Sequence, residues 1–157
     1  MYLLHSASQI KKAAVVKRIA PADLVQINNE RFVFDWSNMA KDCELYQLNL
    51  INDDEILGIM AIKDSSEQHW IEIKLLESSM ENVGRQKEYQ RIAGTLMGFA
   101  CREAVKRHAP FPCVSLVPKT ILKEYYILKY GMLDGSKFLY LDEEPLLHMV
   151  KKYYYGS

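Results

Sequence analysis

The glutamate in the stretch "HWIEIKLLE" is the residue whose type and position most suggest chemistry. Glu72 lies between Ile71 and Ile73, and strand alternation directs these two neighbours to the opposite face. A carboxyl group held within an apolar strand has a raised pKa, which suits a general base. The alternative is that Glu72 lies on a solvated face and pairs across the strands with a lysine, for which Lys63 is the candidate.

The segment after this strand has the composition of an anion site. A polar loop with a glycine leads into a helix that opens with "RIAGT". The first N–H groups of a helix lack intrahelical partners, and the helix dipole adds positive charge there. Small residues allow a phosphate to approach the backbone, and basic residues attract it. The small residues are Ala93, Gly94 and Thr95, and the basic ones are Arg85, Lys87 and Arg91. The alternative is that the small residues pack against the sheet and the basic ones are solvated.

The composition is that of a globular domain. Of 157 residues, 49% are hydrophobic and 25% charged, which excludes a disordered chain. Twenty basic and twenty acidic residues give zero net charge, so nucleic acid is not an expected partner. The three cysteines are odd in number and widely spaced, which is not typical of a disulfide framework or a zinc site. The cysteine pattern is instead typical of a reducing cytoplasm, and no apolar run is long enough for a membrane span. Since 157 residues fit one domain, we expect a soluble, cytoplasmic, single domain over residues 1–157.

Periodicity predicts the elements that position these residues. Pro21 favours the start of a short helix, and "SNMAKDC" is typical of a loop. Three strands are predicted at residues 44–51, 55–64 and 69–77, joined by polar turns as in an antiparallel meander. A further strand precedes the short helix.

In the second half of the chain, the spacing of apolar residues changes from that of strands to that of a helix. Apolar residues at helical spacing predict a helix over residues 89–107, which the prolines of "HAPFP" end. Residues 113–117 are typical of a buried strand, and a helix over 119–130 closes at Gly131. One or two final strands are expected in residues 137–155. The order β-β-β-α-β-α-β predicts an α/β (α+β) domain with a mixed, mostly antiparallel sheet flanked by helices.

Three stretches in this order resemble the GNAT superfamily of acyl-CoA-dependent N-acyltransferases, over residues 44–155. "WIEIKLLESS" resembles the family's fourth strand, which leads into the loop that binds the CoA pyrophosphate. "QRIAGTLMGFA" resembles the [QR]xxGx[GA] signature and its helix, and "ILKEYYILKYGM" resembles the helix that ends in "FYxxxGF".

The signature is matched with two departures. When Ile92 and Ala93 are aligned with its last pair, Arg91 fills the earlier glycine position and Glu88 the usual Gln or Arg position. Arg91 fits there if its backbone keeps ordinary helical angles, and its guanidinium then has a phosphate within reach. Glu88 is less favourable beside a pyrophosphate.

The resemblance implies site residues. The main chain of Leu75 and Leu76 matches the position that holds the pantetheine arm of acetyl-CoA. The implied phosphate contacts are Arg85, Arg91, Ile92, Ala93, Gly94 and Thr95.

Two catalytic residues follow from the same resemblance. Glu72 matches the place of a general base that some members carry, and Tyr126 is close to the place of the tyrosine that protonates the CoA sulfur. Tyr126 precedes Gly131 by one residue more than the family pattern has, so Tyr125 is the alternative acid.

The implied activity is N-acetyl transfer from acetyl-CoA to an amine, carried by a small molecule or a protein, in a ternary complex. The alternatives are a non-catalytic acyl-CoA-binding or protein-interaction module on the same fold, and a toxin–antitoxin component. The C-terminal "KKYYYGS" is interpreted as a terminal edge strand or a contact in a homodimer.

Overall fold

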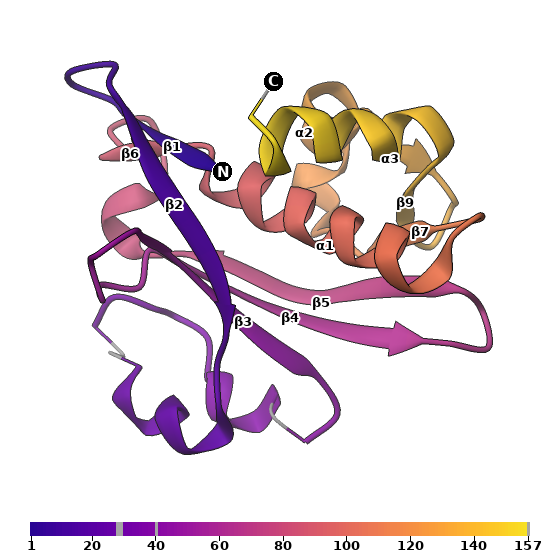
Figure 1. The fold of residues 1–157 in the computed structure, drawn as a ribbon, viewed down its shortest axis with the longest axis horizontal. Helices are drawn as coiled ribbons and strands as arrows, with labels where there is room; N and C mark the ends of the chain where they lie inside the picture. Colours follow the sequence, from indigo (N-terminus) through magenta and orange to yellow (C-terminus); the bar gives the residue numbers. More distant parts are fainter. Residues whose placement is uncertain (28–29, 40, 157) are drawn as a thin grey trace.

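A nine-stranded sheet forms the framework of the protein in the computed structural model, which describes residues 1–27, 30–39 and 41–156. The strand order is β6-β1-β2-β3-β4-β5-β7-β9-β8 (Figure 1). The strands are β1 (Tyr2–His5), β2 (Lys11–Arg18), β3 (Glu44–Leu50), β4 (Gly58–Ser65), β5 (Trp70–Ser78), β6 (Tyr89–Gln90), β7 (Cys113–Leu116), β8 (Leu133–Asp134) and β9 (Leu139–Asp142). The α-helices are α1 (Ile92–His108), α2 (Lys123–Tyr130) and α3 (Glu143–Met149).

The predicted meander and the mixed sheet are confirmed. β3, β4 and β5 pair antiparallel in succession, as the short polar turns between them require. β5 and β7 pair in parallel, and the long connection between them contains α1. The other pairings between described strands are antiparallel, so the sheet is mostly antiparallel as expected.

Helix α1 covers one face of the sheet (Figure 1). Leu96, Met97 and Ala100 recur at helical spacing and are fully buried in the core that also contains Ile71 and Ile73. The helix begins at Ile92, later than the periodicity predicted. The reason is that the two residues of β6 are paired with β1, a partner from the far end of the sequence that no local pattern indicates.

The opposite face of the sheet has its own smaller core. Ile59 and Ala61 of β4 pack there with Trp36 and Phe32, under two short 3-10 helices. These are η1 (Pro21–Gln26), which begins at the predicted proline, and η2 (Trp36–Met39), which lies where a loop was expected. The predicted loop also includes Ala40, which is outside the described residues.

The C-terminal segment is helical, so the prediction of a terminal edge strand is wrong. After β9, the chain forms α3 and then a π-helical turn, η5 (Val150–Tyr154). Four apolar residues at spacings of three and four turn inward: Leu146, Met149, Val150 and Tyr153 are buried against α1. The segment packs on α1 instead of adding a strand to the sheet. A second correction is that the helix predicted over residues 119–130 begins as a 3-10 turn, η4 (Thr120–Leu122), before α2.

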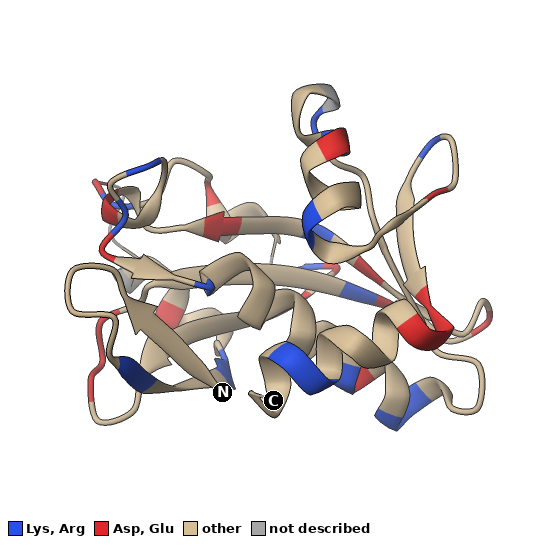
Figure 2. Cartoon of the chain, turned by 90° about the horizontal axis from the view of Figure 1, so that it is seen from above, with Lys and Arg blue, Asp and Glu red and all other residues tan. Residues whose placement is uncertain are grey.

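The two ends of the chain lie together. A Cβ built on Gly156 would lie 3.2 Å from ring atoms of Tyr2, so the C-terminal turn contacts β1. Basic and acidic residues are interspersed along the chain rather than separated by sign (Figure 2). Within the described residues we find neither a membrane-crossing helix nor a cluster of three or more His, Cys, Asp or Glu that could hold a metal ion.

Candidate functional site

Strands β5 and β7 separate after a short paired stretch, and the separation opens a groove. Their parallel pairing runs from Trp70 and Cys113 to Ile73 and Leu116. Beyond Ile73, β5 continues to Ser78 and pairs with β4 on its other side. The edge of residues 74–78 that faces away from β4 therefore offers backbone N–H and C=O groups that β7 does not pair. The groove has a volume of about 450 Å³.

An irregularity in the sheet lies at the start of this groove. Ala61 pairs with Leu75 and Ile62 with Ile73, so Lys74 is an extra residue on β5. Such a bulge reverses the facing of all later side chains on its strand. Leu76 therefore packs against the core beneath α1, while Leu75 joins the smaller core on the other face. Both leucines line the groove, and they are the residues that the resemblance assigns to the pantetheine arm.

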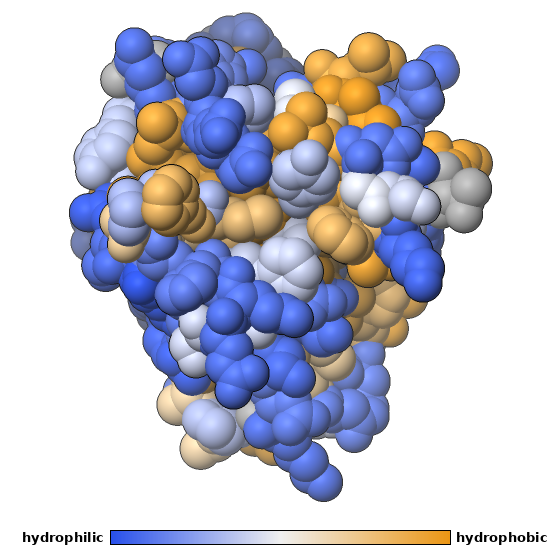
Figure 3. All heavy atoms as spheres, turned by 90° about the vertical axis from the view of Figure 1, so that its right-hand side faces the viewer, coloured by the Kyte–Doolittle hydropathy of each residue, from blue (hydrophilic) through white to orange (hydrophobic). Residues whose placement is uncertain are grey.

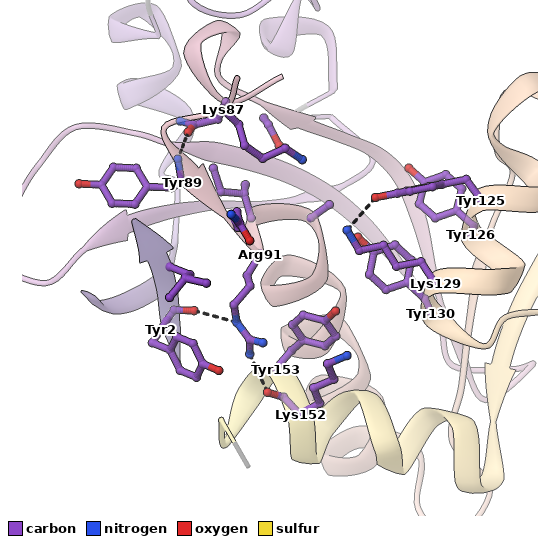
Figure 4. A pocket seen from close by; sticks show the side chains of 16 residues that line it. Tyr2, Lys87, Tyr89, Arg91, Tyr125, Tyr126, Lys129, Tyr130, Lys152 and Tyr153 are labelled. Carbon is purple, nitrogen blue, oxygen red and sulfur yellow. Dashed lines mark hydrogen bonds between the residues drawn. The ribbon is translucent and has the colours of Figure 1, made fainter. Parts of the chain in front are cut away.

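A second cavity, of about 320 Å³, adjoins the groove at the N-terminal end of α1 (Figure 4). It is lined by four basic residues and six tyrosines, and by no acidic residue among those the structure describes. The basic residues are Lys87, Arg91, Lys129 and Lys152, and the tyrosines are Tyr2, Tyr89, Tyr125, Tyr126, Tyr130 and Tyr153. Ile92 and Ala93 bring the first turn of α1 to its wall. Because N–H groups of a first turn are unpaired within the helix, this cavity favours an anion.

Two tyrosines of α2 line both cavities. Tyr126 is half-buried, and burial raises its pKa, with a smaller contribution from the neighbouring Tyr125. Tyr125 is 45% exposed, and its hydroxyl accepts a hydrogen bond from the Lys129 ammonium at 2.8 Å. Figure 4 shows both rings projecting from α2 beside Lys129 and Tyr130. α2 ends where predicted, at Gly131, whose φ of 71° is left-handed.

Solved structures that align with most of this chain include acetyltransferases. The ribosomal-protein-S18-alanine N-acetyltransferase from Escherichia coli aligns with 82% of this chain and 93% of its own, at a TM-score of 0.58 and 10% identity. The dodecameric spermidine N-acetyltransferase from Vibrio cholerae aligns with 89% and 95%, at 0.59 and 12%. A GNAT family acetyltransferase from Elizabethkingia anophelis, with acetyl-CoA bound, aligns with 83% and 98%, at 0.54 and 15%.

The chain has the GNAT fold. Its sequence matches no protein-family model and no curated protein sequence. The likeness is therefore one of fold, at 10–15% sequence identity.

Arg91, which was aligned with the earlier glycine of the signature, does not have the helical backbone angles that this alignment required. Its backbone is left-handed, with φ of 82°, rather than helical. Its guanidinium lies between the rings of Tyr2 and Tyr153, 4.0 and 4.6 Å from their centroids. It also donates a hydrogen bond to the carbonyl of Lys152 at 2.7 Å (Figure 4). Arg91 thus joins the start of α1 to both ends of the chain.

The small residues after Arg91 have two different roles: some are buried in packing contacts, and one lines the cavities. A Cβ on Gly94 would lie 2.3 Å from the Tyr153 ring, so the glycine permits η5 to pack on α1. Gly98, one turn later, meets the same tyrosine and the backbone of Met149 and Tyr154. Thr95 is fully buried, and Ala93 lines both cavities. Gly94 therefore packs as the second alternative expected, but against η5 rather than the sheet.

We expect Gly94→Ala to destabilise the protein by about 1–3 kcal/mol, because the added methyl group overlaps the buried Tyr153 ring. Denaturant unfolding would measure the change. In a Tyr153→Ala background the same substitution should be neutral or stabilising, since alanine is the better helix former by about 1 kcal/mol. An equal loss in both backgrounds would show that the contact with Tyr153 is not the cause.

Four predicted residues line neither cavity, namely Glu72, Arg85 and the packed residues Gly94 and Thr95. Arg85 is exposed and lines neither of them. Glu72 also lines neither; its carboxylate pairs with Lys74 at 3.0 Å, while Lys63 is its cross-strand neighbour in the backbone register. Ile71 and Ile73 do face the opposite side, as predicted. The hypothesis that Glu72 is a general base therefore rests on the resemblance alone.

Glu77 is the residue of the groove that the sequence pattern missed. It is 8% exposed, and its carboxylate accepts hydrogen bonds from Val33 N at 2.5 Å, Phe34 N at 3.3 Å and Trp36 Nε1 at 2.9 Å. These bonds fasten the segment of Val33 and Phe34, which forms one wall of the groove, to β5. Lys129 and Lys152 were also missed, because α2 and η5 bring them to the cavity from distant parts of the sequence.

A third hollow, of about 270 Å³, lies at the other end of α1. It is bordered by Pro110, Phe111, Pro112 and Leu147, and it shares no lining residue with the two cavities above. Figure 3 views the molecule from the right-hand side of Figure 1 and shows apolar side chains gathered in its upper half. None of the residues predicted for chemistry lies in this hollow.

Proposed function

We propose that the protein is an N-acetyltransferase that moves an acetyl group from acetyl-CoA directly to an amine in a ternary complex. The observation that carries the proposal is the junction of the two cavities. Tyr126, Lys87 and Ala93 line both the basic cavity at the start of α1 and the groove between β5 and β7. A ligand with phosphates at one end and an uncharged arm at the other matches this pair of spaces.

The residues suit the parts of acetyl-CoA in different ways. Lys87, Lys129 and Lys152, with the first N–H groups of α1, would hold the phosphates, because charged donors and a helix N-terminus both favour them. The free edge of β5 at Leu75 and Leu76 would pair with the amides of the pantetheine arm. These are the same two leucines that the resemblance indicated.

Bound acetyl-CoA would supply the acetyl group as a thioester. Tyr126 keeps its proton at neutral pH, since burial raises a pKa that is already about 10 in water. It would hold that proton at the junction and donate it to sulfur as the carbon–sulfur bond breaks. The proton released by the amine would pass to water, since the described residues place no unpaired carboxylate in the groove.

The first experiment is a calorimetric titration with acetyl-CoA. We expect binding that Lys87→Gln and Lys129→Gln each weaken by about tenfold or more, since a hydrogen bond to a charged group contributes about 1.5–3 kcal/mol. Lys12→Gln is the matched control, because Lys12 on β2 lines neither cavity. Arg91 is not used, because its contacts with Tyr2 and Tyr153 would mix binding with folding.

The titration also separates the rival function. Binding without release of free CoA in the presence of any amine would favour a non-catalytic acyl-CoA-binding module. That rival has one observation in its favour: Arg91, at the signature position, has its guanidinium committed to the termini. Absence of binding at millimolar acetyl-CoA would contradict both functions.

A further inference from the structure

The groove beyond the junction has apolar walls on three sides. The segment after η1 contributes Val33 and Phe34, β5 contributes Leu75 and Leu76, and the chain between β7 and α2 contributes Val117 and Leu122. Val33 is 74% exposed and Val117 64% exposed, so these side chains lie at an open mouth rather than in the core. An occupant of this mouth would cover apolar surface that is now in contact with water.

The charges at the groove are mainly positive. Lys74, Lys87 and Lys119 line it, and Glu77 is the one acidic lining residue in the described chain. Glu77 does not attract a cation, because its two oxygens already accept the three N–H groups named above. Lys74 is partly neutralised by Glu72.

Lys119 is placed to meet an anionic ligand. Its ammonium lies 5.8 Å from the centroid of the Phe34 ring, at the apolar wall. It forms no ion pair with a carboxylate in residues 1–27, 30–39 or 41–156. An anion held there would gain a charged partner at little cost, since the lysine loses no existing ion pair.

We propose that the acceptor is an apolar amine that also carries a carboxylate, as an aromatic or branched amino acid does, and that Lys119 binds this carboxylate. A polyamine is the disfavoured class, because recognition of several ammonium groups requires unpaired carboxylates in the groove. The identification of this ligand as the acetyl acceptor rests on the proposed function. The binding preference itself depends on the walls and charges of the groove.

Phenylalanine and 2-phenylethylamine test the proposal, because they share the ring and the amine and differ by the carboxylate. Calorimetry on the full chain, saturated with CoA, should show phenylalanine binding about fivefold to tenfold more tightly. Lys119→Glu should abolish or reverse the preference. Lys12→Glu, which changes the net charge equally on β2, should leave the preference intact.

These binding measurements test the proposed ligand preference and do not require catalytic turnover. Equal binding of both amines, or tighter binding of 2-phenylethylamine, overturns it, as does the absence of binding by either. A preference for phenylalanine that survives Lys119→Glu removes the assigned role of Lys119. If phenylalanine is preferred and Lys119 is required, but no acetyl group is transferred, the groove assignment stands and the transferase function fails.

Discussion

Replacement of Tyr126 by phenylalanine should lower kcat for acetyl transfer by about 10²- to 10⁴-fold, the range that a positioned general acid contributes. The KM for acetyl-CoA should change little, because the ring keeps its place between the basic cavity and the groove. The expectation follows from position and protonation together. Tyr126 lines both spaces, and its raised pKa keeps the phenol protonated throughout the neutral range.

Tyr125→Phe is the matched control, since it removes a hydroxyl from the next residue of the same helix. That hydroxyl is solvent-accessible and bonded to Lys129, so we expect a loss of activity of less than about tenfold. A rate profile against pH adds an independent readout. Because burial raises the Tyr126 pKa above its usual value near 10, activity that needs the protonated phenol should persist to about pH 10 and decline above it.

Steady-state kinetics of both variants, with release of free CoA as the signal, would make the comparison. A larger loss in Tyr125→Phe than in Tyr126→Phe would assign the acid to Tyr125, the alternative that the "FYxxxGF" register leaves open. Equal activity of all three proteins would remove both tyrosines from the proton transfer. Circular dichroism would confirm that the phenylalanine variants are folded.

Local periodicity predicted the elements that are bounded by local signals. The turns after residues 51 and 64 and the prolines at 110 and 112 mark ends that the structure keeps. Gly131 closes α2 by the backbone bond to Ile127 that a left-handed residue permits. The resemblance, which rests on the order of such elements, gave the fold correctly for the same reason.

The wrong prediction of a C-terminal strand concerns a segment whose apolar residues do have helical spacing. The aromatic run at residues 153–155 favours a strand by composition. The spacing of Leu146, Met149 and Val150 is helical, and it continues to Tyr153. The two glycines of α1 then decide the outcome, because they permit the close approach of η5. That contact joins residues about sixty positions apart, and no local pattern indicates it.

The part of the candidate site that the sequence predicted is largely defined by main chain, although the side chains of Lys87, Arg91 and Tyr126 were also predicted and line it. Leu75, Leu76, Ile92 and Ala93 line the cavities because a strand edge and a helix start lie there, whichever side chains are present. The side chains that surround them depend on pairing partners. Arg91 contacts residues of the two termini, and the lysines of the basic cavity come from a loop, α2 and η5. A single sequence gives no distance between such segments.

The bulge at Lys74 explains why the glutamate chosen from the sequence is not the one in the groove. Glu72 and Glu77 are five positions apart, so strict alternation places them on opposite faces. The extra residue between them brings both to the face opposite α1. Glu72 then lies at the solvated end of that face beside Lys74, while Glu77 lies under the segment of Val33 and Phe34.

Glu77→Ala should therefore destabilise the protein by about 3 kcal/mol, because the buried Trp36 indole N–H and two backbone N–H groups lose a charged acceptor. Glu72→Ala, on the same strand, should cost at most about 1 kcal/mol, since it removes an exposed ion pair. Denaturant unfolding of the two variants would measure the difference. Near-equal losses would contradict the anchoring role of Glu77.

A milder substitution of Glu77 should change the shape of the groove while the protein remains folded. Val33 and Phe34 form the wall beside Lys119, and the carboxylate is what fastens them to β5. In Glu77→Gln the side chain keeps one acceptor oxygen but presents an N–H₂ group to the remaining donors, so the wall loses its fixed position. We expect KM for the amine to rise more than KM for acetyl-CoA, whose phosphates would bind at the other cavity. A rise in the KM for acetyl-CoA alone would instead place Glu77 in support of the cofactor.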